Sequence, residues 1–357
     1  MKTLAKLPVT IVTGFLGSGK TTLLRHMLDN AQGRRIAVIV NEFGELGIDG
    51  EILKQCSIGC TEEEASGRVY ELANGCLCCT VQEEFFPVMR ELVARRGDLD
   101  HILIETSGLA LPKPLVQAFQ WPEIRNACTV DAVITVVDSP AVAAGTFAAF
   151  PEQVDAQRKQ DPNLDHESPL HELFADQLAS ADLVVLNKAD LIDAAALAAV
   201  RAEVVEELPP AVKVIEASKG SLPLEVLLGL GAESEAHIDG RRTHHDSHHD
   251  GDDDDHDDHD HDAFDSISLE LPEASESLLL DALNQLVKDT GILRVKGFAA
   301  IPGKPMRLLI QGVGSRFDKH FDRAWRSDEA RVTRLVLIGQ DLDAPALQAR
   351  LHAALGA

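Results

Sequence analysis

Positive charge is scarce in this sequence of 357 residues, in which 33 Lys and Arg residues face 58 Asp and Glu residues, giving a formal net charge of −25. Nucleic acids and anionic membrane surfaces repel a chain this acidic, so neither is expected as a partner. Long hydrophobic runs are missing too, and none reaches the length of a membrane span. The lysines and apolar residues at the start run directly into a glycine-rich loop, which cleavage of a signal peptide would destroy, so no signal peptide is expected.

Cysteine is also sparse, with six residues in the chain. Three of the six are crowded into positions 76 to 79, which is unlike a secreted disulfide framework. We therefore expect a reducing, cytoplasmic compartment.

Apolar, β-rich runs alternate with helical patterns through the first two-thirds of the chain. Most of the runs are almost wholly apolar, as expected of a parallel sheet that is covered on both faces. This pattern predicts a three-layer α/β domain with a mostly parallel sheet. The expected strands are 9–12, 36–40, 101–104, 132–137, 183–186 and 212–215, and the expected helices include 22–30, 81–95, 171–180 and 194–207.

The composition changes abruptly after about residue 235. Residues 243–262 hold seven histidines and ten aspartates and nothing that could build a core, so this tract is expected to be a disordered linker. The tract is either a solvated charge run or a loose, unspecific sink for divalent ions. The expected organisation is a nucleotide-binding domain over 1–235, a linker over 236–262 and a small α+β domain over 263–357, with runs at 264–271, 278–287, 292–301, 306–313 and 333–338 and a largely antiparallel sheet.

Residues 14–21 fit the phosphate-loop pattern GxxxxGK[S/T] and lie between an expected strand and an expected helix. Backbone N–H groups of such a loop cradle phosphates at the positive end of the helix. Lys20 is expected to reach the β- and γ-phosphates, and Thr21 to supply a hydroxyl to Mg²⁺. The residues expected to bind the nucleotide in this loop are Gly14, Gly17, Ser18, Gly19, Lys20, Thr21 and Thr22.

Two further motifs follow expected strands and complete this prediction. Glu105 ends one strand and is followed by Thr106-Ser107-Gly108, which suggests an Mg²⁺-linked carboxylate and a glycine turn that senses the γ-phosphate. Asn187-Lys188-Ala189-Asp190 ends another, and its amide and carboxylate could read the guanine edge while the Lys188 stem packs along the base. Ser218, after the next strand, is a weaker candidate for the base pocket. Lys20 and Glu105 are the candidate catalytic residues, and no glutamine is placed to orient the attacking water.

Cys76, Cys78 and Cys79 precede a helix-capping pattern, Thr80 to Glu83. The positive end of a helix lowers a thiol pKa and favours the thiolate that binds metal. A redox pair is the alternative, although adjacent Cys78 and Cys79 would form a strained disulfide. Cys56 and Cys60 could add ligands but are treated as ordinary, and Cys128 is expected to pack in a core strand.

Together, the phosphate loop, Glu105 to Gly108, Asn187 to Asp190 and the Cys76-Leu77-Cys78-Cys79 segment resemble the CobW-type, metal-handling family of P-loop GTPases. The resemblance covers nearly the whole chain. It implies a three-layer P-loop NTPase fold, binding of GTP with Mg²⁺, slow hydrolysis, and a metal ion held by the three thiols.

The resemblance also implies which metal ion is carried and which protein accepts it. It points to Co²⁺ delivered towards the corrin ring of cobalamin, with a metal-accepting protein of that pathway, such as a cobalt chelatase, as partner and a homodimer as one option for assembly. The alternatives are a zinc (Zn²⁺) or nickel insertion GTPase of the same family, or a passive metal store whose GTPase unit only regulates assembly.

Overall fold

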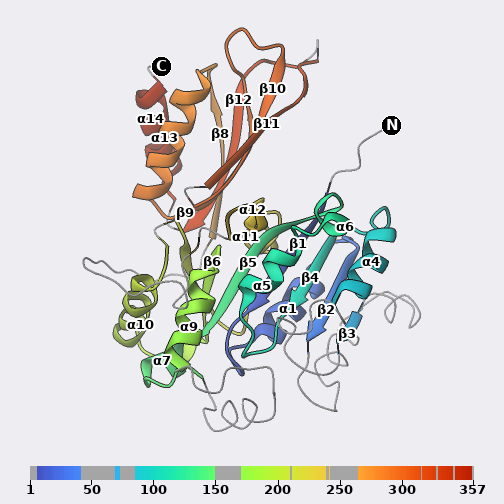
Figure 1. The fold of residues 1–357 in the computed structure, drawn as a ribbon. Helices are drawn as coiled ribbons and strands as arrows, with labels where there is room; N and C mark the ends of the chain where they lie inside the picture. Colours follow the sequence, from blue (N-terminus) through green and yellow to red (C-terminus); the bar gives the residue numbers. More distant parts are fainter. Residues whose placement is uncertain are drawn as a thin grey trace. The chain divides into compact units, whose positions relative to one another are not determined.

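The computed structural model describes residues 6–41, 69–72, 85–148, 170–209, 211–238, 241, 264–314, 316–326, 329–340 and 342–355. The chain divides into two compact units, one formed by residues 1–210, 214–229 and 233–260, and the other by residues 211–213, 230–232 and 261–357. Each unit has its own sheet (Figure 1).

The first unit contains a seven-stranded sheet with the order β3-β2-β4-β1-β5-β6-β7. All pairings from β3 through β6 are parallel. The carboxyl ends of β1, β4, β5 and β6 therefore meet at one edge of the sheet, where ligands bind in folds of this kind. The strands are β1 (Leu7–Thr13), β2 (Ile36–Asn41), β3 (Val69–Leu72), β4 (His101–Glu105), β5 (Cys128–Asp138), β6 (Leu183–Asn187) and β7 (Lys213–Ala217).

Helices cover both faces of this sheet. Val9 and Ile11 of β1 share a core cluster with Met89 of α4 and Val116 of α5, which places these helices on one face. Successive strand residues point to opposite faces, so Thr10 and the other intervening residues face the layer that includes α1. The helices are α1 (Lys20–Asp29), α4 (Phe86–Ala94), α5 (Pro112–Ala118), α6 (Pro122–Arg125), α7 (Ser139–Ala143), α9 (Leu170–Ala179), η2 (Ala189–Leu191), α10 (Ala194–Glu206), α11 (Leu224–Leu227) and α12 (Ser234–His237).

The second unit is a five-stranded antiparallel sheet with the order β11-β10-β9-β12-β8. Two helices, α13 (Glu276–Asp289) and α14 (Ala344–Leu355), lie side by side (Figure 1) and share one core with the inward residues of the sheet. Leu279, Leu283 and Leu347 are among the helix residues in that core. The strands are β8 (Phe264–Leu271), β9 (Ile292–Ala299), β10 (Met306–Val313), β11 (Arg316–Ala324) and β12 (Thr333–Gln340).

The predicted fold class is confirmed, since a three-layer α/β unit is followed by a small α+β unit. The elements that the prediction did not name include β3, β11 and α14. The strand β3 has only four residues, β11 is rich in charge, and α14 is an alanine-rich helix at the end of the chain. The first unit also continues past residue 236, where the linker was expected to begin, because Ile238 is fully buried in its core.

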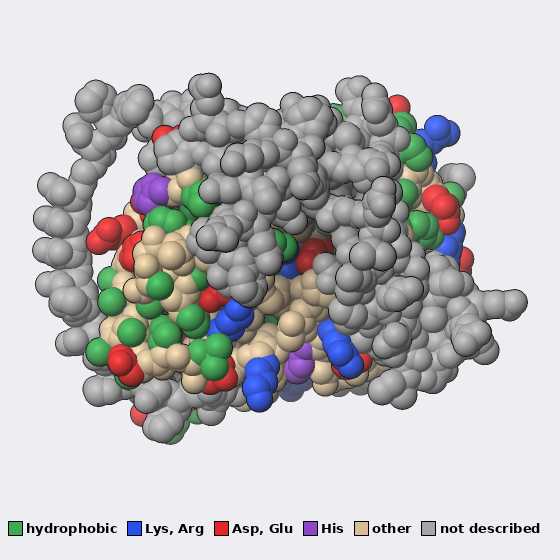
Figure 2. Space-filling view, turned by 90° about the horizontal axis from the view of Figure 1, so that it is seen from below, with side chains coloured by type: hydrophobic (Ala, Val, Ile, Leu, Met, Phe, Trp, Pro, Cys, Tyr) green, Lys and Arg blue, Asp and Glu red, His purple; other side chains and the backbone are tan. Residues whose placement is uncertain are grey.

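No helix in the described part of the chain combines the length and apolar character needed to cross a membrane. On the face shown in Figure 2, described Lys and Arg side chains lie singly among Asp and Glu side chains. The described part of that face therefore presents no broad surface of one charge.

Candidate functional site: a phosphate loop with its switch and base segments

The phosphate loop, residues 14–21, joins the end of β1 to the start of α1. Gly19 occupies the position before the helix in a left-handed conformation, and no side chain caps the helix there. At such a helix start, an anion is the ligand that the helix dipole favours. Lys20 is buried, and its ammonium donates to the carbonyl oxygen of Phe15 at 3.1 Å, across the loop.

A buried hydroxyl in the same loop supports this interpretation. Ser18 is fully buried, and its Oγ has no hydrogen-bond partner among the described residues. A buried polar atom left unpaired costs about 1–3 kcal/mol, so such atoms in folded proteins usually have a ligand or water as partner. The loop therefore has a hydrogen-bonding capacity that a bound phosphate could use.

Thr21 and Glu105 meet at the mouth of this loop. The Thr21 hydroxyl, in the first turn of α1, donates to a carboxylate oxygen of Glu105 at 2.9 Å, although 84 positions separate the two residues. Glu105 is 4% exposed and ends β4, the strand next to β1. A hydroxyl and a carboxylate are the oxygen donors that Mg²⁺ takes beside phosphates, so the residues present fit this ion.

Gly108 lies directly against the phosphate loop. A Cβ atom added to Gly108 would come within 2.5 Å of the backbone nitrogen of Leu16, which no real side chain could tolerate. The preceding Thr106 is tied to β1 through its hydroxyl, which donates to that of Thr13 at 3.0 Å. The predicted glycine turn is thus in contact with the phosphate loop, as sensing of the γ-phosphate would require.

Asn187 links three segments of the site. Its amide nitrogen donates to the carbonyl oxygen of Ser18 at 2.8 Å, and its amide oxygen accepts from the N–H of Gly220 at 3.0 Å. Gly19 must lack a side chain for this to happen, because a Cβ there would lie 2.3 Å from the Asn187 amide nitrogen. Asn187 is 2% exposed, and its two hydrogen bonds join the phosphate loop to the turn at Gly220. That its amide reads the guanine edge stays a prediction.

The remaining base-pocket candidates lie around Asn187. Lys188 adopts a left-handed conformation, and its ammonium lies 2.5 Å from a carboxylate oxygen of Asp138. Asp190 lies on η2 and is exposed. Ser218 follows β7 and forms an isolated bridge with Ser221, which closes the turn that presents Gly220 to Asn187. Asp190 is exposed and Ser218 is half-buried, and their contact with a base stays a prediction.

The cysteine segment lies outside the described residues, as do Cys56 and Cys60. The elements on either side of it are tied together, since the Tyr70 hydroxyl of β3 donates to Glu91 at 2.8 Å and accepts from Arg95 at 2.6 Å, just past α4. Within the described residues, no group of three or more His, Cys, Asp or Glu side chains could hold a metal ion.

Cys128 is the cysteine that the structure describes. The prediction that it begins a core strand is confirmed, because it is the first residue of β5 and is fully buried. Burial raises its pKa to about 12. The thiol therefore stays protonated at neutral pH, which makes it a poor metal ligand.

A parallel sheet, a phosphate loop at the carboxyl end of β1 and a hydroxyl–carboxylate pair beside it define a P-loop nucleotide-binding protein. Residues 8–216 match the family described as "CobW/HypB/UreG, nucleotide-binding domain", and residues 264–355 match the "Cobalamin synthesis protein cobW C-terminal domain". The chain belongs to the CobW family of P-loop GTPases. The family resemblance and the GTPase class predicted from the motifs are both confirmed.

Several relatives match over nearly their whole length, two of them at more than half identity. "Zinc chaperone CobW" of Pseudomonas aeruginosa is 80% identical over 99% of this chain and 93% of its own. "Zinc chaperone CobW" of Sinorhizobium sp. is 52% identical over 98% of this chain and 97% of its own. Among solved structures, the Zn(II)-bound YjiA GTPase from E. coli is 24% identical, with 99% of both chains covered and a TM-score of 0.41.

Sequence reasoning missed three residues of this site. Asp138 ends β5 as Glu105 ends β4, so an acid at the end of an apolar run was a signal that could have found it. Gly220 and Gln177 gave no such signal. Their roles depend on contacts with Asn187 and with residues 108–110, which are far away in the sequence.

Proposed function

We propose that this protein is a GTP-dependent metallochaperone that carries Zn²⁺ and delivers it to a metal-accepting protein in the cytoplasm. The family assignment supports GTP use, and relatives 80% and 52% identical carry the name zinc chaperone. Co²⁺ delivered for cobalamin synthesis, through a cobalt chelatase, is the second candidate, because the chain contains the C-terminal domain described for cobalamin synthesis.

The described residues support a separate role for each side chain around the nucleotide. Lys20 binds the β- and γ-phosphates, and the N–H groups at the start of α1 bind phosphate oxygens. Thr21 and Glu105 hold Mg²⁺, which when bound offsets the charge on the transferring phosphoryl group. Asp190 reads guanine, while Asn187 and Lys188 keep its loop in place.

Cys76, Cys78 and Cys79 are proposed as the metal ligands. The observation that carries this proposal is the chain order, since their segment connects β3 to α4 within the unit that holds the phosphate loop. The strand β3 is two strands away from β4, whose end carries Glu105. Three thiolates suit Zn²⁺. Because such a site binds Zn²⁺ more tightly than Co²⁺, the protein would carry Co²⁺ only where the supply of metal in the cell favours it.

The test replaces Cys76, Cys78 and Cys79 with serine and measures tightly bound Zn²⁺ against a competing chelator. We expect loss of the tight site with GTP binding retained, because none of these thiols belongs to the phosphate loop. Cys128→Ala is the matched control, since it removes a buried, protonated thiol and should leave the tight site intact. A tight site that survives in the triple variant would show that the ligands lie elsewhere.

A further inference from the structure

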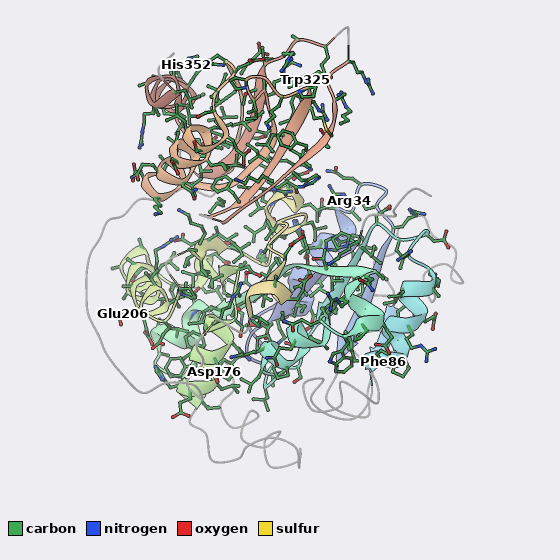
Figure 3. The ribbon with its side chains drawn as sticks, turned by 45° about the horizontal axis from the view of Figure 1, so that its top comes forward. Arg34, Phe86, Asp176, Glu206, Trp325 and His352 are labelled. Atoms are coloured by element: carbon green, nitrogen blue, oxygen red, sulfur yellow. The ribbon has the colours of Figure 1, made fainter. Side chains whose placement is uncertain are left out.

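Gln177 is a fully buried side chain of α9 that none of the motifs includes. Its amide nitrogen donates to the carbonyl oxygens of Gly108 and Ala110, each at 3.2 Å. Both partners are acceptors, which fixes the orientation of the amide. Figure 3 labels Asp176, the residue of α9 directly before Gln177.

The segment that Gln177 holds is the glycine turn after Glu105. Residues 107–110 form a closed turn, in which the Ala110 N–H donates to the Ser107 carbonyl oxygen at 3.1 Å. One side of this turn presses on Leu16 of the phosphate loop, and the other accepts both hydrogen bonds of Gln177. The turn is therefore held between the phosphate loop and α9.

The helix α9 is itself held by contacts with the phosphate loop and with β5. The Phe174 ring stacks on that of Phe15 in the phosphate loop, with centroids 6.1 Å apart. The carbonyl oxygen of Gln177 accepts from the Thr135 hydroxyl of β5 at 3.1 Å. A side chain on so firmly held a helix can fix the position of a turn.

The amide oxygen of Gln177 is the other polar atom of this side chain. It is buried and has no hydrogen-bond partner among the described residues. An idle acceptor next to a backbone turn offers a second set of partners if the turn changes its position. The amide nitrogen can thus hold the turn in one position, and the amide oxygen can hold it in another.

We propose that Gln177 is a positioning residue of the GTPase reaction, which sets the Gly108 turn against the phosphate loop so that the turn responds to the γ-phosphate. It acts through the turn and does not touch the reacting atoms. The affinity for nucleotides with a γ-phosphate therefore depends on the position of the turn, whereas GDP has no group that reaches the turn. Gln177 therefore governs the discrimination between GTP and GDP.

The test compares Gln177→Met, which keeps length and burial but loses both donors, with the wild type. We expect the affinity for a non-hydrolysable GTP analogue and the turnover number each to fall about tenfold, with GDP affinity changed by less than about twofold. Ser180→Ala is the matched control, because it removes one buried hydrogen bond at the end of the same helix without contacting the turn. Both affinities should stay near the wild-type values in this control.

Two results would overturn the proposal. One is an equal loss of affinity for GDP and the analogue, which indicates a purely structural role, and the other is no loss for either. The ratio of the two affinities is measured within one sample, so a reduced folded fraction cancels. If Gln177→Met fails to fold, Gln177→Asn retains the amide but is one methylene too short, and the same ratio should fall.

Discussion

The ammonium group of Lys188 lies 2.5 Å from a carboxylate oxygen of Asp138, and the pair joins the ends of two neighbouring strands, β5 and β6. The Asp138 side chain is 2% exposed, and its other oxygen caps α7 by accepting from the N–H of Ala141. Lys188 is held in a left-handed conformation at the start of the segment that carries Asp190. The pair therefore fixes the segment that we propose reads the base to the body of the sheet.

Replacing Asp138 with asparagine should lower GTP affinity by about tenfold, because a charge-assisted hydrogen bond is worth about 1.5–3 kcal/mol. Discrimination against ATP should fall with it, and titration with labelled GTP and ATP measures both. Ser275→Ala, which removes the cap of α13 in the second unit, controls for the loss of a helix cap. GTP affinity equal to that of the control would remove Asp138 from the site.

Gly108→Ala should reduce GTP turnover by about tenfold or more. The new Cβ would meet the backbone of Leu16 at 2.5 Å, so the turn or the phosphate loop must move, and overpacking of this kind costs about 1–3 kcal/mol. Gly97→Ala is the control, because the space around Gly97 is open to 4 Å. If steady-state assays give the same turnover for both variants, contact between the turn and the loop is unimportant for hydrolysis.

His101 should make the protein less stable as pH falls below about 6.5. Its Nε2 lies 2.8 Å from the Thr10 hydroxyl, and burial lowers its pKa from the ordinary value of 6.5, with Arg34 adding to this and Asp131 opposing it. The unfolded chain therefore binds the proton first, and stability decreases by up to about 1.4 kcal/mol per pH unit until the folded pKa is reached.

Thermal melting from about pH 7.5 to about pH 5.5 measures this effect. His101→Gln, which has no charge to gain, should lose less stability over this range than the wild type. Equal losses in the two proteins would show that His101 does not control the acid sensitivity.

The parts of the fold that the sequence predicted are those with a local signal. The strand β1 and helix α1 follow from an apolar run that ends in a phosphate-loop pattern, and β4 from an apolar run that ends in Glu105. The strand β11, at the edge of its sheet, holds only two phenylalanines among charged residues, so no apolar run marks it. In the site, the sequence motifs assigned both Thr21 and Glu105 to Mg²⁺, and the two side chains are hydrogen-bonded. The two hydrogen bonds of Asn187 join loops that are far apart in the sequence, so no local pattern predicts them.

The proposed function requires that the GTP state controls how tightly the protein holds its metal ion. It is tested most directly by the Zn²⁺ dissociation constant, measured by chelator competition with a non-hydrolysable GTP analogue and Mg²⁺, and again with GDP and Mg²⁺. A variant lacking residues 243–262 should be used, so that the seven histidines of the tract do not add loose binding. We predict tighter binding with the analogue by a factor between about 5 and 150, and Zn²⁺ must favour the analogue over GDP by the same factor. Equal Zn²⁺ affinity in the two nucleotide states would show that the nucleotide does not control metal binding and would indicate a passive metal store.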